Sequence, residues 1–205
     1  MLTPEHAHWP SGLNDLGPTA SVALWARGNT ALLTSSAGIA IVGAWAATSY
    51  GELVAVEITA GSVDCGRSGY SGAAYGIDGA AHCAALASRG TTIAILIDGV
   101  DRFYLTGHDA LLTRIAESGV MLSKVSSGHE PTKWRFLAAA STATVDIEAG
   151  LRSGSLATAV HAVSLKRPLG AVPRHVASSA SAGCCHPIRN YGATWVANAD
   201  DAHLL

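Results

Sequence analysis

Three glycine-rich stretches have the composition of anion-binding turns. They are VGAWAATSYG (residues 42–51), SGAAYGID (71–78) and EAGLRSGSL (148–156). Each stands before a segment with a helical pattern, so backbone N–H groups at the helix start could hold a phosphate that approaches closely over the glycines. Tight turns between a strand and a helix also use glycine for packing alone, so each stretch by itself has two interpretations.

Cations stand beside or near these turns. Arg152 directly precedes a Ser-Gly-Ser turn at 153–155, and the segment PTKWRF (131–136) alternates two cations with two rings, as Lys133, Trp134, Arg135 and Phe136. Such alternation is typical of sites that hold the phosphates of a single strand and stack on its bases. The alternative is a surface loop whose rings pack inward.

Asp78 and His82 are four residues apart and would share one helix face, which is the spacing of an acid–base pair. The interpretation that we favour makes Asp78 the N-cap of a helix and His82 a structural residue of the same turn. The chain has no G-x-S-x-G elbow, Walker lysine or complete dinucleotide-binding glycine pattern. We therefore expect neither a catalytic residue nor a cofactor. We expect no metal site either, because CCH at 184–186 lacks a second ligand cluster.

The charge of the chain is unevenly distributed, although the formal net charge is only −2. Residues 1–123 hold five basic and ten acidic side chains, a net of −5, whereas residues 124–189 hold eight basic and three acidic side chains, a net of +5. The later region is therefore a local positive field on a nearly neutral protein, which suits an anionic partner. The alternative is an accident of surface charge.

Apolar strand patterns alternate with helical patterns along the chain. We expect strands at 39–43, 68–74, 91–97, 120–125, 144–148 and 169–173, and helices at 48–61, 76–90, 107–119 and 155–168. This alternation predicts a three-layer α/β fold with a mostly parallel, doubly wound sheet, which is Rossmann-like. Ligands of such sheets bind beyond the carboxyl ends of the strands, where the three glycine turns would lie.

The first 38 residues are predicted to form an N-terminal extension that packs on a core domain of residues 39–205. Trp9 and Trp25 are its expected anchors. The opening MLTPEHAHWP has no apolar signal-peptide core, and the uncharged residues 28–51 are too polar for a membrane span. Cysteines without paired spacing suit reduced thiols. We therefore expect a cytoplasmic protein that makes no membrane contact.

An ordered series of motifs over almost the whole chain resembles the DNA-processing protein A family, also called DprA or Smf. The segments that carry this resemblance are IAIVGAWAATSYG (39–51), SGAAYGIDGAAH (71–82), TIAILIDGVDRFY (92–104), LRSGSLATA (151–159) and SAGCCHPIRNYGA (181–193). The resemblance implies an extended Rossmann-like domain that binds single-stranded DNA and delivers it to the RecA recombinase during natural transformation. It also implies a homodimer without catalytic activity.

The resemblance assigns DNA-contact roles to residues that match the family motifs position by position. Lys133 would supply a phosphate contact and Phe136 a ring that stacks on a base. The remaining matches lie in the glycine turns: Gly43 in the first, Ser71, Gly72, Gly76, Asp78 and His82 in the second, and Arg152, Ser153, Gly154 and Ser155 in the third. Arg135 is a further candidate for a phosphate contact.

The chain also departs from the family pattern, as a divergent or truncated member would. Trp45 replaces the family's turn arginine, and an arginine-bearing segment of about one helix is missing after Leu137, which would remove phosphate contacts and a crossover element. Asp146 stands in a presumed core strand, where an unpaired carboxyl costs about 1–3 kcal/mol. Two alternatives stay open: a phosphoribohydrolase-like nucleotide enzyme, for which Glu148 is the nearest match to a catalytic residue, and a decayed homologue without activity.

Overall fold

The computed structural model describes residues 1–101, 106–124, 133–150, 153–173 and 182–205. Within these ranges the chain forms one eight-stranded sheet in the order β1-β5-β4-β3-β2-β6-β7-β8, in which only β1 runs antiparallel to its neighbour. The fold is the mostly parallel, doubly wound α/β fold that the alternating pattern predicted. The strands are β1 (Trp25–Gly28), β2 (Gly38–Val42), β3 (Ser68–Ser71), β4 (Thr92–Leu96), β5 (Val120–Ser123), β6 (Ala143–Asp146), β7 (Leu169–Ala171) and β8 (Thr194–Trp195).

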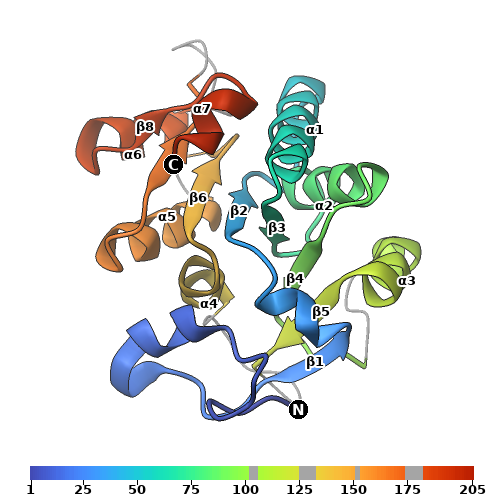
Figure 1. The fold of residues 1–205 in the computed structure, drawn as a ribbon. Coiled ribbons are helices and arrows are strands. Elements are labelled where there is room, and N and C mark those ends of the chain that lie inside the picture. The colour runs from blue at the N-terminus through green and yellow to red at the C-terminus, as the bar shows by residue number, and fades with distance from the viewer. Residues whose placement is uncertain (102–105, 125–132, 151–152, 174–181) are drawn as a thin grey trace.

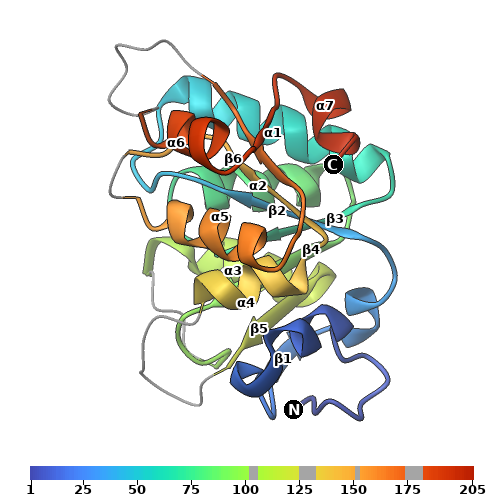
Figure 2. The same cartoon turned by 90° about the vertical axis from the view of Figure 1, so that its left-hand side faces the viewer.

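Helices cover both faces of the sheet and complete three layers (Figure 1). Helices α1, α2 and α3 lie on one face, and Figure 2 looks onto the other, where α6, α5 and α4 lie one below another in front of the strands. The helices are α1 (Ser49–Asp64), α2 (Ile77–Ala87), α3 (Asp109–Ser118), α4 (Lys133–Ala140), α5 (Ser155–Ser164), α6 (Ala182–Asn190) and α7 (Ala199–His203), with short 3-10 turns η1 (Ser11–Thr19), η2 (Thr30–Leu33) and η3 (Thr106–His108).

The central strand β2 is buried on both faces, as its unbroken apolar sequence predicted. Ile39 and Ile41 belong to the core between the sheet and α1, whereas Ala40 and Val42 belong to the core on the α4 side. Because β2 is packed on both faces, the position at which it ends is fixed. The glycine turn after Val42 therefore leaves the sheet edge at a defined point.

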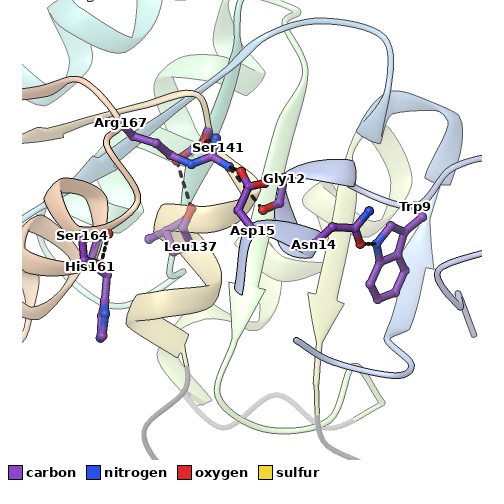
Figure 3. A network of polar contacts seen from close by, with 9 residues as sticks. All are labelled: Trp9, Gly12, Asn14, Asp15, Leu137, Ser141, His161, Ser164 and Arg167. Atoms are coloured by element: carbon purple, nitrogen blue, oxygen red, sulfur yellow. Dashed lines mark hydrogen bonds and ion pairs between the residues drawn. The ribbon is translucent and has the colours of Figure 1, made fainter. Parts of the chain in front are cut away.

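The N-terminal residues are held to the core through Arg167 (Figure 3). The Arg167 guanidinium donates to the carbonyl oxygens of Gly12 and Ser141 and forms an ion pair with Asp15 at 2.9 Å. Trp9 is buried, as expected, and its indole N–H donates to Asn14 at 3.0 Å. Arg167 therefore joins this N-terminal segment to the ends of α4 and α5.

Trp25, the other expected anchor, is only partly covered, because the residue is 42% exposed. The residue lies on β1, which pairs with β5 at the edge of the sheet, so its neighbours cover only part of the ring. Residues 25–28 are thus a strand of the core sheet itself. The division of the chain at residue 38 stays a prediction.

Two other expectations are corrected by the observed elements. The crossover that the shortened segment after Leu137 was expected to remove is present, because α4 runs to Ala140 and only two residues separate it from β6. Asp78 is not the N-cap of α2: Gly76 occupies that position and Asp78 lies in the first turn. No helix in the described ranges is long and apolar enough to span a bilayer.

Candidate functional site

The strand order reverses between β2 and β6, and the glycine turns of both strands leave the sheet there. The two strands are parallel neighbours with Val42 opposite Asp146. The chain continues from β2 into α1 and from β6 into α5, on opposite faces of the sheet. Such a switch point is where doubly wound sheets form ligand crevices, because the two connections diverge from each other.

A pocket of about 390 Å³ lies at this switch point. Two of its walls are indoles, because Trp45 follows β2 and Trp134 stands at the start of α4. The turn residues of β2 and β6 and the start of α5 complete it, together with Asp78 from α2; the lining is Val42, Gly43, Ala44, Trp45, Asp78, Trp134, Gly150, Ser153, Gly154 and Ser155. Residues from all three predicted turns therefore meet around one cavity.

The first and second turns are held together by backbone contact. The N–H of Ile77 donates to the carbonyl oxygen of Ala44 at 3.2 Å. Gly76 has a positive φ of 70°, and a Cβ atom there would lie 2.3 Å from the Ala44 oxygen and 2.4 Å from the Trp45 oxygen. Glycine is therefore required at position 76 both by conformation and by space, and this contact fixes the backbone that carries Trp45.

The third turn is shaped by Trp134. A Cβ atom on Gly154 would lie 2.7 Å from Cζ2 of Trp134, so glycine allows the indole to lie against the start of α5. The hydroxyls of Ser153 and Ser155 are 2.9 Å apart, and Ser155 donates to Oδ2 of Asp146 at 3.4 Å. The serine hydroxyls of this turn are thus joined to a buried carboxyl at the end of β6.

Burial raises the pKa of Asp146 to about 7, against the effect of the Ser155 hydrogen bond, and the nearby Asp78 carboxylate raises it further. The side chain is fully buried, and its Oδ1 has no hydrogen-bond partner among the described residues. The burial problem that the sequence indicated at Asp146 is therefore real, and burial favours the protonated form of this carboxyl.

Several backbone N–H groups at the three turns donate to the protein's own acceptors. The amide of Thr48 donates to Glu148, Ala74 to Asp78 and Ser153 to Gly150, at 2.8, 3.3 and 2.9 Å. Around α5, Ser155 donates to the hydroxyl of Ser153. The expectation of free helix-start amides for an anion is thus corrected at these positions, because nearby side chains and turns reach them first.

The Glu148 side chain accepts hydrogen bonds from Thr48, the N-cap residue of α1. Its two carboxylate oxygens accept from the amide and the hydroxyl of Thr48 at 2.8 and 3.0 Å, and its side chain is 1% exposed. Glu148 does not line the pocket. The nearest sequence match to a phosphoribohydrolase glutamate is therefore engaged in joining the turn after β6 to α1, which argues against that enzyme.

Several predicted site residues have structural positions away from the pocket. Ser71 is buried and donates to the carbonyl oxygen of Ile41 at 2.7 Å, Gly72 is buried beside it, and His82 lies 2.7 Å from the Thr92 hydroxyl. Phe136 is 3% exposed and packs in the core on the α4 side. Its assignment as a base-stacking ring is corrected, because α4 turns residue 136 toward the sheet.

The predicted cations are only partly described. Arg135 is half-buried on α4 and lies close enough to His161 of α5 to add to the burial that lowers the pKa of that histidine. Arg152 and the side chain of Lys133 lie outside the described residues. In sequence they are the neighbours of Ser153 and Trp134, which line the pocket.

Trp45 lines the pocket, although the sequence indicated this residue only as the replacement of an arginine. Its side chain is 54% exposed at the rim of the pocket. An aromatic residue two positions after a glycine turn that ends a buried strand is the signal that could have identified it. No group of three His, Cys, Asp or Glu side chains suited to a metal occurs in the described part of the chain.

Comparison with known proteins gives one consistent match in sequence. The family model of DNA recombination-mediator protein A matches residues 1–204. A DNA processing protein DprA of Mycobacterium tuberculosis is 44% identical over 218 aligned positions, covering 98% of this chain and 56% of that protein. The DNA processing protein DprA of Streptococcus pneumoniae is 34% identical, covering 89% of this chain and 66% of that protein.

The chain is shorter than the relatives that it matches. The chain spans little more than half of the mycobacterial relative. The aligned stretch of 218 positions also exceeds the 205 residues of this chain, so the chain lacks residues that the mycobacterial relative has within the matched region.

The solved structures agree with the sequence matches. DprA from Streptococcus pneumoniae superposes with a TM-score of 0.91 at 29% identity, covering 99% of this chain and 72% of that chain. A structure of DNA processing protein A from Helicobacter pylori, described for its single-stranded DNA binding mode, gives 0.85 at 25% identity, with 95% and 92% coverage. A molybdenum cofactor binding protein from Rippkaea orientalis gives 0.62 at 15% identity and shares the fold alone.

Proposed function

We propose that this chain, which belongs to the DNA recombination-mediator protein A family, binds single-stranded DNA across the sheet edge that carries the pocket. The observation that supports this most is the meeting of all three glycine turns and two tryptophans at the β2/β6 switch point. The Helicobacter pylori relative, whose structure covers nearly the same fold, is described as binding single-stranded DNA.

The proposed strand is held without sequence preference, by cations on its phosphates and by rings on its bases. Lys133 and Arg152 are the cations that we assign to phosphates, because each adjoins a pocket residue in the chain. Arg135 is a weaker candidate, since it is half-buried against α5. We assign no catalytic role to any residue.

Family membership also supports a wider role as a proposal. We propose that the chain works as a homodimer in the cytoplasm, without contacting a membrane, and that it passes single strands to RecA during natural transformation. The chain spans 56% of the mycobacterial relative, so this role is proposed for the protein family's shared domain and is tested separately from DNA binding.

Fluorescence anisotropy with a labelled dT20 strand tests the proposed function. We expect binding that weakens with salt, and Lys133→Ala or Arg152→Ala should each reduce the slope of log K against log salt by about 0.7. Arg114→Ala is the matched control, because Arg114 is exposed on α3 and lies away from the pocket. Absence of measurable binding at physiological salt would favour a decayed homologue.

A further inference from the structure

We propose that the switch-point pocket receives a nucleobase, stacked on Trp45 and Trp134, while the phosphates of the strand run outside it. This inference rests on the proposed function and specifies which part of the nucleic acid enters the cavity. Its starting point is the composition of the pocket, which differs from that of a phosphate cradle.

The charge of the pocket lining favours a neutral ligand. Among the described residues that line the pocket, the only charged side chain is a carboxylate, Asp78. The Asp78 carboxylate at a small cavity disfavours a phosphate there, whereas a neutral base carries no such penalty.

The hydrogen bonds of the third turn also favour a base over a phosphate. A phosphate needs donors, and the amides of Ser153 and Ser155, which line the pocket, already donate within the protein. The Ser155 hydroxyl is likewise committed to Asp146. The pocket thus presents mainly small apolar residues and two indoles, which suits a flat ring that is held by stacking and buried surface.

The two tryptophans are placed where they could stack on a base in the pocket. Trp45 is 54% exposed and lines the pocket, so its ring is accessible to a ligand there. Its carbonyl oxygen is pressed against Gly76, so the backbone that carries the indole is fixed before a ligand arrives. Trp134 is held against Gly154 in the same way. Little conformational entropy is lost on stacking against Trp134, because its ring is already positioned.

The chemistry predicts tolerance of all four bases. Every base offers a π-face, and stacking on an aromatic side chain is sequence-tolerant.

The test compares a labelled dT20 strand with a 20-mer of abasic residues that has the same phosphates. We expect the abasic strand to bind about tenfold more weakly, with an equal salt slope, as loss of stacking predicts. Trp45→Ala should weaken dT20 about tenfold and leave the abasic strand unchanged. Trp195→Ala is the control, because Trp195 is 65% exposed on the edge strand β8 and does not line the pocket.

A second probe keeps the inference testable if a variant folds poorly. In a strand with one 2-aminopurine flanked by abasic residues, binding to the wild-type protein should quench the fluorescence of that base by stacking. Equal affinity for dT20 and the abasic strand, or binding without quenching, overturns the base pocket and leaves the proposed function intact. Failure of both strands to bind overturns the proposed function and the base pocket with it.

Discussion

Glu148 and Thr48 are one hundred residues apart in the sequence and are joined by two hydrogen bonds, from the Thr48 amide at 2.8 Å and from its hydroxyl at 3.0 Å. Thr48 is also the N-cap of α1, and its hydroxyl accepts from the amide of Gly51. The pair therefore links the turn after β6 to the helix that follows β2, at the switch point of the sheet.

Glu148→Ala should lower the free energy of unfolding by about 1–3 kcal/mol, because the partly buried amide and hydroxyl of Thr48 lose this acceptor. Urea denaturation followed by circular dichroism measures this change. Glu57→Ala, on the exposed face of the same helix α1, is the control and should stay within about 0.5 kcal/mol of the wild type. Equal small effects of both substitutions would show that the pair is not stabilising.

Gly76→Ala should destabilise the protein more than an ordinary glycine substitution. The new Cβ would lie 2.3 Å from the Ala44 oxygen, in addition to the strain of a φ of 70°. Gly66→Ala separates the two effects, since Gly66 has a φ of 79° but nothing within 4 Å of its Cβ position. We expect about 1–2 kcal/mol for Gly66→Ala and a larger loss for Gly76→Ala. Indistinguishable denaturation midpoints would contradict the close contact between the first two turns.

Asp146 should make stability fall as pH rises. Its pKa is about 7 in the folded protein against an ordinary value of 3.8, so between these values the folded state binds the proton more tightly than the unfolded chain does. The contribution is fully present below about pH 4 and is lost as pH rises through about 7, on the order of 4 kcal/mol in total. Asp146→Asn removes this dependence, and the difference between the two proteins' stabilities across pH measures it. A pH-independent difference would mean that the carboxyl stays ionised.

Phe136 should behave as a core residue and not as a DNA contact. Phe136→Ala is expected to cost about 3–5 kcal/mol of stability, because the ring is 3% exposed and packs in the core on the α4 side. Phe136→Leu keeps most of that volume, and its affinity for dT20 should stay within about twofold of the wild type. The neighbouring Trp134→Leu, at the pocket wall, should weaken binding. Tenfold weaker binding by Phe136→Leu would restore the stacking role that the sequence indicated.

The sequence by itself determined the class of fold and the edge at which the site lies. Periodicity predicted the two-sided burial of β2, and glycine turns after parallel strands marked the carboxyl edge, because hydrophobic patterning and turn chemistry are local properties of the chain. The motif series likewise indicated the family that the whole-length match shows.

The tertiary structure decided what occupies each position at that edge. The acceptors of the turn amides come from distant segments, as Glu148 does for Thr48, and no local pattern reveals them. The direction of Phe136 into the core and of Trp134 into the pocket depends on how α4 packs on the sheet beside α5. Contacts between residues far apart in sequence set these outcomes, since burial and hydrogen bonding are decided by the neighbours that folding brings together.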